Sequence, residues 1–173
     1  MRLFFLRHGI AEPGHSGLSD FDRQLTDEGR AELEEVAHGL RRLKIRPDRL
    51  LSSPLVRARQ TADAVALALA ASVEIADELR SGATFAAFQQ LTRRYSADEA
   101  LMFVGHEPDF SETAAALIGA DGDGLVLKKA GLIRVDLDGG FERGQGRLRW
   151  LLTPHQLVLI GGSKAEHGGD TSG

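Results

Sequence analysis

The chain has 173 residues, which is enough for one domain with a full hydrophobic core but too few for two. Its hydrophobic share of 42% and charged share of 27% are typical of a globular protein and argue against disorder. The net charge of −4 excludes a protein that holds nucleic acid by summed positive charge, and the absence of cysteine excludes disulfides, thiolate zinc sites and cysteine nucleophiles.

The apolar pattern alternates between short strands and amphipathic helices as far as residue 118. It predicts strands at residues 2–6, 49–54, 73–76 and 101–104, and helices at residues 27–43, 56–71, 84–95 and 111–118. After that the pattern changes to strands joined by glycine-rich turns, at residues 125–127, 132–137 and 147–152. This order predicts a three-layer α/β fold: a mostly parallel central sheet with helices on both faces and antiparallel strands at one side.

The domain boundaries follow from the loss of apolar pattern near the C-terminus. We expect one domain over residues 1–160 and a flexible tail at residues 161–173, in which His167 is given no role. The apolar run near the N-terminus is too short for the core of a signal peptide, and residues 64–71 are too short for a membrane span. The chain is therefore expected to be soluble and cytoplasmic.

Unusual residues follow three of the four strands predicted before residue 118. Arg7-His8-Gly9 follows the first, Ser52-Ser53-Pro54 leads from the second towards Arg57, and Gly105-His106 follows the fourth. Ligands of open α/β sheets bind outside the carboxyl ends of the strands. We therefore expect two histidines and at least two arginines to converge at one rim of the sheet.

This combination of residues indicates chemistry on an anion. Guanidinium groups match phosphate or carboxylate oxygens, and a neutral imidazole is a nucleophile towards phosphorus. Nearby arginine charge is expected to lower the pKa of His8 and keep it neutral, and Gly9 is expected to let the backbone approach a ligand. Taken alone, a histidine at a strand end is more often structural, and Arg57 and Arg59 suit a solvated helix face.

Four segments together resemble the histidine phosphatase (phosphoglycerate-mutase-like) superfamily. They stand in the order and at the spacing typical of that family, at residues 6–9 (Leu-Arg-His-Gly), 24–29, 52–62 and 104–108. The resemblance is closest to the compact SixA-type phosphohistidine phosphatases. Ile10 stands where the mutases usually carry glutamate, the chain has no asparagine, and the segment before Tyr95 leaves no room for a helical lid. The resemblance thus implies an open, shallow site that suits a protein-borne substrate.

The resemblance also implies a role for each matching residue. His8 would be the nucleophile that becomes phosphorylated, and His106 would stabilise charge in the transition state. Arg7 and Arg57 would clamp the phosphoryl oxygens, so that the phosphate-binding set comprises both histidines and both arginines. Glu78 lies in a segment similar to the one that supplies the proton-donating glutamate in fructose-bisphosphatase-like members. It is the candidate general acid, although a solvated loop carboxylate is equally compatible.

The other polar residues near the motifs are expected to be structural or solvated. Arg59 is expected to form a salt bridge on its helix. Ser52 and Ser53 could donate to phosphate, but serines at strand ends are usually structural. Solvated or structural positions are expected for His15, Asp20, Asp22, His38 and His155.

The leading hypothesis is a metal-independent phosphatase that needs no cofactor. It would hydrolyse phosphohistidine on another protein, such as a phosphotransfer domain, through a covalent phosphohistidine on the enzyme, with no nucleic-acid or membrane partner. The first alternative keeps this mechanism but acts on a small phosphate ester. Two further alternatives are a non-catalytic module that binds phosphorylated partners and a metallohydrolase with His8 and His106 as ligands, which lacks an H-E-x-x-H pair.

Overall fold

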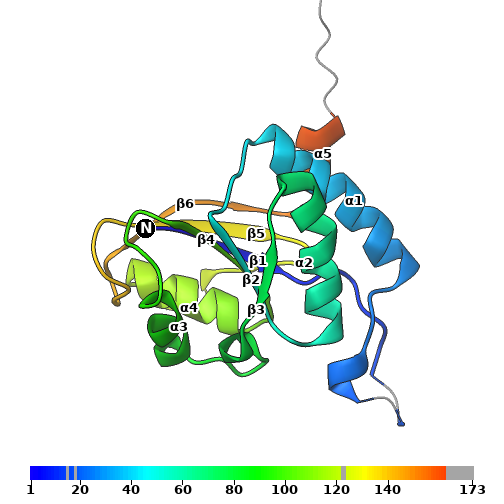
Figure 1. The fold of residues 1–173 in the computed structure, drawn as a ribbon, viewed down its shortest axis with the longest axis horizontal. Helices are drawn as coiled ribbons and strands as arrows, with labels where there is room; N and C mark the ends of the chain where they lie inside the picture. The colour runs from blue at the N-terminus through cyan, green and yellow to red at the C-terminus, as the bar shows by residue number, and fades with distance from the viewer. Residues whose placement is uncertain (15, 18, 122–123, 163–173) are drawn as a thin grey trace, which may run out of the picture.

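The protein is described by a computed structural model that covers residues 1–14, 16–17, 19–121 and 124–162. In this part of the chain one six-stranded sheet has the order β3-β2-β4-β1-β5-β6 (Figure 1). The pairs between β1, β2, β3 and β4 are parallel, and β5 and β6 add antiparallel pairs. The bounds are β1 (Arg2–Arg7), β2 (Arg49–Ser52), β3 (Val73–Ile75), β4 (Ala100–Gly105), β5 (Leu132–Leu137) and β6 (Gly146–Leu152).

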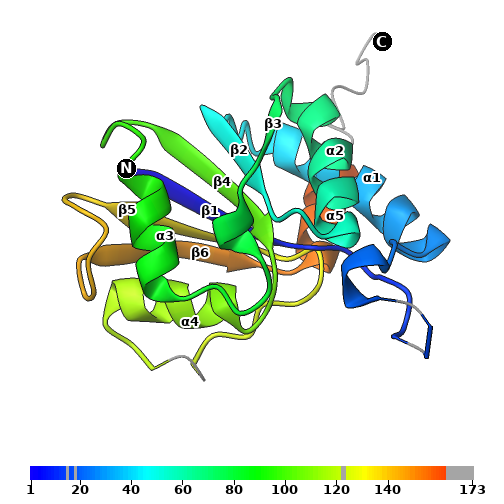
Figure 2. The same ribbon diagram turned by 60° about the horizontal axis from the view of Figure 1, so that its bottom comes forward.

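Helices cover both faces of the sheet. One group of three lies on one face and a pair lies on the other (Figures 1 and 2). The first group is α1 (Asp27–Arg42), α2 (Val56–Leu69) and α5 (Pro154–Gly162), and the pair is α3 (Phe85–Thr92) and α4 (Asp109–Ile118).

Each face of the sheet has its own hydrophobic core. Along β1, Phe4 and Leu6 pack in the core beneath α1, α2 and α5, whereas Leu3 and Phe5 pack beneath α3 and α4. Strands buried on both faces read as continuous apolar runs because successive side chains point to opposite faces. The predicted three-layer α/β fold with antiparallel strands at one side is confirmed. None of the described helices has the length and apolar character needed to cross a bilayer.

Two elements differ from the sequence prediction. Residues 125–127 are not a strand. Leu127 is buried, and its carbonyl accepts a hydrogen bond from the Arg7 side chain instead of pairing in the sheet. Helix α5 was not predicted, because its glycine-rich end resembled the start of the tail. Residues 163–173 of that tail lie outside the described residues, so its predicted flexibility stays a prediction.

Helix α5 depends on close packing against α1, which no local sequence pattern indicates. A side chain on Gly39 of α1 would bring a Cβ within 2.1 Å of the Leu157 carbonyl oxygen in α5. Since real atoms cannot approach so closely, the two helices pack in this way only because residue 39 is glycine. The contact joins residues more than a hundred positions apart, which explains why the sequence pattern missed it.

The sheet order brings the chemically unusual strand ends together. Strand β4 lies between β2 and β1, with Arg7 opposite Gly105 and Ser52 opposite Val104. The backbone N–H of His8 donates to the Gly105 carbonyl at 3.0 Å. His106 therefore follows the strand that separates Ser52 from Arg7, so the three motifs meet at one rim.

Glycines in two of the motifs serve packing. A Cβ on Gly29, in the first turn of α1, would lie 2.2 Å from the Ile10 carbonyl oxygen, and a Cβ on Gly9 would lie 2.9 Å from the Leu33 side chain. Gly9 therefore lets the chain after β1 pack against α1, and the ligand approach that the sequence suggested stays a prediction. This packing holds the backbone that follows His8.

Candidate active site

His8 presents a neutral ring in one definite tautomer. Its Nδ1 lies 2.8 Å from the Gly9 carbonyl oxygen, which can only accept, so Nδ1 carries the hydrogen. On the other side of the ring, Nε of Arg57 donates to Nε2 at 3.3 Å. Nε2 therefore carries the lone pair that a nitrogen nucleophile towards phosphorus requires, and in this structure that lone pair accepts from the guanidinium group.

Burial keeps His8 neutral. The side chain is 7% exposed, and burial lowers its pKa to about 3. The hydrogen bond to Gly9 opposes this shift, while the charges of His106, Arg57 and Arg7 lower the pKa further. Arginine charge, which the sequence suggested as the cause, is therefore a smaller contribution than desolvation.

His106 lies beside His8 and is also neutral. The ring centroids are 5.3 Å apart, and the His106 side chain is 2% exposed. Its pKa falls to about 4, chiefly through burial and then through the charge of Arg57, while Asp20 acts in the opposite direction. As a neutral ring it can act as a hydrogen-bond donor towards phosphoryl oxygens. Both rings are buried rather than lying open at the surface.

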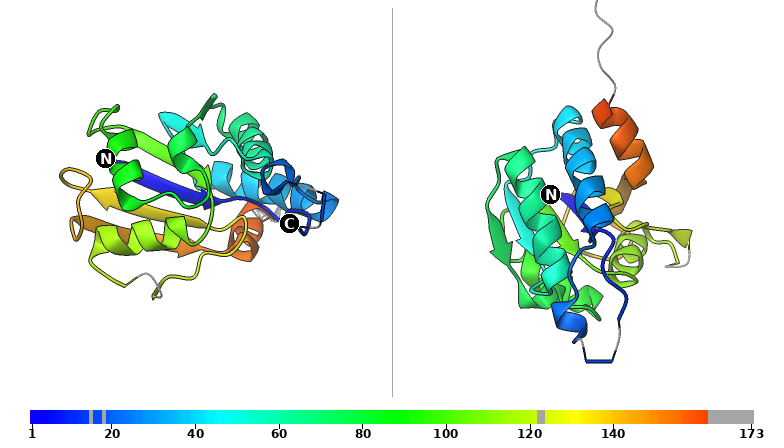
Figure 3. Two further views of the ribbon diagram at one scale, coloured as in Figure 1. Left: turned by 90° about the horizontal axis from the view of Figure 1, so that it is seen from below. Right: turned by 90° about the vertical axis from the view of Figure 1, so that its right-hand side faces the viewer.

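Arg57 is fixed by a residue that sequence analysis placed in solvent. Its Nη1 donates to the Asp20 carbonyl at 2.6 Å, and its Nη2 donates to Asp20 Oδ2 at 3.0 Å. Asp20 belongs to the short helix η1 (Asp20–Asp22), which the segment after β1 carries to the side of α2 (Figure 3). Hydrogen bonds from Arg23 and then Arg57 lower the pKa of Asp20 and hold it as a carboxylate, although burial opposes this. The i,i+3 spacing of Asp20 and Arg23 was visible in the sequence, but the pairing with Arg57 was not.

Arg7 contributes a second guanidinium at the same rim. Its Nη1 donates to the Leu127 carbonyl at 2.8 Å. Its Nε and Nδ1 of His106 are buried and have no hydrogen-bond partner among the described residues. Buried polar atoms are nearly always paired, and an unpaired one is a sign of a functional site. Arg7 Nε can only donate, so it suits the oxygens of a phosphoryl group.

Glu107 is a carboxyl group that sequence analysis did not assign. It directly follows His106, is half-buried, and accepts a hydrogen bond from the Ser111 N–H at 3.0 Å. Burial raises its pKa, while the bonds to Ser111 and the charge of Arg7 act against the rise. A half-buried carboxyl group beside His106 can hold a proton, and only its position in the sequence signalled it.

Glu78, the candidate acid from the sequence, is engaged elsewhere. It lies in the short helix η2 (Asp77–Leu79) after β3, and its carboxylate forms an ion pair with Arg94. Within the described residues, none of its hydrogen bonds or ion pairs reaches His8, His106 or Arg57. The structure therefore does not bring Glu78 into the cluster.

Of the remaining polar residues, some contact the cluster and others do not. Ser53 Oγ lies 2.8 Å from Nε2 of His106, whereas Ser52 Oγ donates to the Ser53 carbonyl at 2.9 Å. Arg59 is exposed on α2 and has no ion pair within the described part of the chain, so the expected salt bridge is not found. His38 and His155 are exposed, in line with the prediction, and His15 lies outside the described residues.

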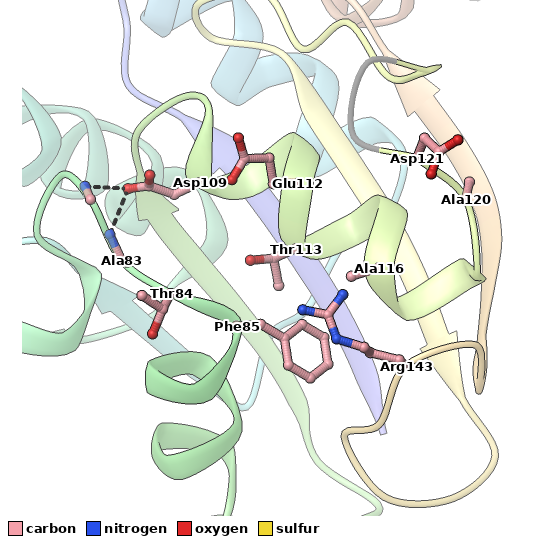
Figure 4. A pocket seen from close by; sticks show the side chains of 11 residues that line it. Ala83, Thr84, Phe85, Asp109, Glu112, Thr113, Ala116, Ala120, Asp121 and Arg143 are labelled. Atoms are coloured by element: carbon pink, nitrogen blue, oxygen red, sulfur yellow. Dashed lines mark hydrogen bonds between the residues drawn. The ribbon is translucent and has the colours of Figure 1, made fainter.

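A hollow of about 490 Å³ is lined by none of the predicted site residues (Figure 4). It runs between α4 and the segment that leads into α3. Arg143 covers the ring of Phe85 at 4.6 Å, and Asp109 accepts from the N–H groups of Gly82 and Ala83. The described residues contain no group of three histidine, aspartate or glutamate side chains that could hold a metal ion.

Known proteins are similar to this chain in sequence and in fold. Residues 3–116 match the Histidine phosphatase superfamily (branch 1). The chain is 31% identical over 165 residues to the phosphohistidine phosphatase SixA of Escherichia coli K12, a match that covers 92% of this chain and 98% of SixA. It is 37% identical over 164 residues to an uncharacterized protein of Picosynechococcus sp., covering 92% and 95% of the two chains.

A solved structure gives the same result. The protein histidine phosphatase SixA complexed with tungstate superimposes with a TM-score of 0.75 at 30% identity, covering 91% of this chain and 99% of that chain. The matched segment contains both histidines and both arginines of the cluster. The chain therefore belongs to the histidine phosphatase superfamily, and within it the chain is SixA-like.

Proposed function

We propose that this phosphatase hydrolyses phosphohistidine on a protein substrate and that His8 carries the phosphoryl group as a covalent intermediate. The observation that carries the proposal is the state of His8. Its Nδ1 hydrogen is held by the Gly9 carbonyl, and its Nε2 lone pair faces Arg57. A neutral imidazole held in this way needs no base to become a nucleophile.

The first step transfers the phosphoryl group to the enzyme. Nε2 of His8 forms a bond to phosphorus while the nitrogen–phosphorus bond of the substrate breaks, and the substrate ring keeps the electron pair. If the distal nitrogen of that ring carries a proton, the ring leaves as neutral imidazole and no further proton is required. Arg7, Arg57 and His106 bind the phosphoryl oxygens, where negative charge is greatest in the transition state.

The second step returns the enzyme to its starting state. Water attacks phosphorus and the bond to His8 Nε2 breaks, so that Nε2 keeps the electron pair of that bond while Nδ1 keeps its hydrogen. Phosphate leaves with both protons of the water. Because His8 has a pKa of about 3, it leaves as a neutral ring again and is ready for another cycle at neutral pH.

A nitrogen-linked substrate fits the site better than an ester for two reasons. An ester needs a proton donor for its poor alkoxide leaving group, and Glu78, the candidate donor, is paired with Arg94. Between β3 and β4 the chain forms only η2 and the eight-residue α3, so this segment supplies no large cover over the rim. A side chain that projects from another protein can therefore reach His8.

The lack of cysteine fits a reducing cytoplasm, and we place the reaction there.

A small phosphate ester is the second candidate substrate, and Glu107 is the observation that favours it. Its half-buried carboxyl group adjoins His106, and burial raises its pKa, so it could protonate an alkoxide.

Side-by-side turnover separates the two substrates. A histidine-phosphorylated phosphotransfer domain and a panel of phosphate esters would be given to the wild type and to Glu107→Gln. We expect a higher kcat/KM for the phosphohistidine protein than for every ester, and no loss of that activity in Glu107→Gln. An ester with the higher kcat/KM, whose turnover also collapses in Glu107→Gln, would establish the second candidate instead.

A further inference from the structure

The hydroxyl group of Ser53 lies fully buried between the end of β2 and His106. Its Oγ accepts a hydrogen bond from the Leu55 N–H at 3.3 Å and lies 2.8 Å from Nε2 of His106. A serine hydroxyl has one hydrogen to donate. Among the described residues, Nε2 of His106 is the acceptor within reach of that hydrogen.

The neutral His106 ring has one N–H, and the two ways of placing it differ in what they leave unpaired. If Nε2 carried the hydrogen, it would donate to Ser53, and the buried serine O–H would have no acceptor within the described part of the chain. If Nδ1 carries the hydrogen, Ser53 donates to Nε2 and both of its interactions are satisfied. The first arrangement therefore leaves two buried groups unpaired, the serine O–H and Nδ1 of His106, whereas the second leaves only the Nδ1–H. Because each unpaired buried polar group is costly, the second arrangement is the stable one.

We propose that Ser53 is a positioning residue that donates its O–H to Nε2 of His106 and thereby holds the His106 proton on Nδ1. The ring then presents an N–H at Nδ1, the buried atom that has no partner among the described residues. Phosphoryl oxygens only accept hydrogen bonds, so this is the tautomer that can bind them. Burial supports the inference, since it lowers the pKa of His106 to about 4 and leaves the ring a single proton at neutral pH.

The two histidines then hold the same tautomer for opposite purposes. In His8, a backbone carbonyl fixes the hydrogen on Nδ1, so that the Nε2 lone pair faces Arg57. In His106, a hydroxyl donor occupies Nε2, so that the Nδ1–H is left for a ligand. The hydrogen-bond partner of each ring therefore determines which ring nitrogen carries the hydrogen.

Nuclear magnetic resonance of the ¹⁵N-histidine-labelled protein tests the tautomer directly. Long-range ¹H–¹⁵N correlations at neutral pH should show His106 protonated on Nδ1 and unprotonated on Nε2. Addition of inorganic phosphate should shift the Nδ1–H resonance as this group gains an acceptor. A His106 ring protonated on Nε2, or on both nitrogens, would overturn the inference even without any variant.

The variant Ser53→Ala removes the proposed donor. It should shift His106 towards the Nε2–H tautomer and lower kcat about tenfold, because one hydrogen bond to a charged group is lost in the transition state. Ser52→Ala is the matched control. It removes an equally buried hydroxyl one residue earlier, which donates to the Ser53 carbonyl and does not contact His106. Ser53→Ala with an unchanged tautomer and turnover, or Ser52→Ala with the same losses, would contradict the proposal.

The catalytic consequence rests on the proposed function, but the tautomer does not. If His8→Ala retains full activity, the proposed mechanism fails, but the tautomer of His106 is still tested independently by its resonances. If His8→Ala is inactive and the wild-type His106 carries its proton on Nε2, only the role of Ser53 fails.

Discussion

Burial controls the protonation of the two active-site histidines. His8 and His106 are 7% and 2% exposed, and desolvation is the largest cause of the fall of their pKa values to about 3 and about 4. An unfolded histidine has a pKa of about 6.5. Both rings are therefore neutral in the folded protein over a pH range in which the unfolded chain would take up protons. The neutral rings therefore lower the free energy of unfolding only as the pH falls.

This difference predicts how stability depends on pH. Because the folded pKa values are depressed, the unfolded state binds more protons between about pH 6.5 and about pH 4, so the free energy of unfolding should fall as the pH falls. Each histidine contributes a slope of up to about 1.4 kcal/mol per pH unit. Urea unfolding of the wild type and of His8→Asn at several pH values measures this slope.

Comparison of the two proteins isolates the effect of His8. Glu107 and Asp109 have raised pKa values and contribute a slope of the opposite sign in both proteins, so their effect cancels in the difference. We expect His8→Asn to flatten the slope and His38→Asn, at an exposed position, to leave it unchanged. Equal slopes in all three proteins would show that His8 is not held neutral by the fold.

At this scale the sequence predicted the reacting groups but not their partners. His8 and His106 directly follow β1 and β4, and Arg7 is the last residue of β1. Arg57 lies in the first turn of α2, which follows β2. The sequence could place these residues together because the ends of parallel strands share one rim. The partners that hold them, Asp20 and Ser53, lie tens of residues away in the sequence. The pairing of Glu78 with Arg94 is likewise a tertiary contact that the sequence pattern did not indicate, and the role of Glu78 as an acid stays a prediction.

Among the elements, the short helix η1 is the one whose position matters most for the site. Two contacts from Asp20 hold the guanidinium of Arg57, and Arg57 in turn donates to His8. Arg80 adds a contact from the far side, with its guanidinium 5.6 Å from the ring of Phe21. The segment after β1 therefore positions Arg57 of α2 beside His8. No periodicity marks a three-residue helix, so the sequence could only describe this segment as a polar loop.

The variant Asp20→Asn should weaken this positioning. Loss of a charged hydrogen-bond partner is expected to lower kcat/KM about tenfold, since Arg57 is then held less firmly. Asp22→Asn is the matched control, because Asp22 lies on the same helix and its side chain has no hydrogen bond or ion pair to the described residues. In an Arg57→Ala background, Asp20→Asn should have no further effect. A full additional loss in that background would mean that Asp20 does not act through Arg57.

The molecule as a whole combines an acidic surface with a small cationic site. The net charge of −4 excludes nucleic-acid binding by summed positive charge, yet Arg7 and Arg57 converge beside two neutral histidines. Asp20 and Glu107 offset part of this positive charge, so the site is less cationic than the arginines alone would suggest. The layer order and the parallel rim could be predicted because strand and helix periods differ. The packing of α5 could not, because it depends on the contact between Gly39 and Leu157.

The composition of the site predicts that catalysis is independent of metal ions. Its groups are two histidines and two arginines, and arginine does not coordinate metal ions. Treatment with excess EDTA, followed by its removal, should leave turnover of the phosphohistidine protein unchanged. A loss of turnover that added Zn²⁺ or Mg²⁺ restores would favour the metallohydrolase alternative.

The central claim is that His8 carries the phosphoryl group, and rapid quenching with a ³²P-labelled phosphohistidine protein tests it most directly. The wild type should show one label per chain that is stable in alkali and lost in acid, as a phosphohistidine is, and fragment analysis should place it on His8. His8→Ala should show no label and no turnover, while His38→Ala should behave as the wild type. Full turnover by His8→Ala, or a label on another residue, would contradict the account.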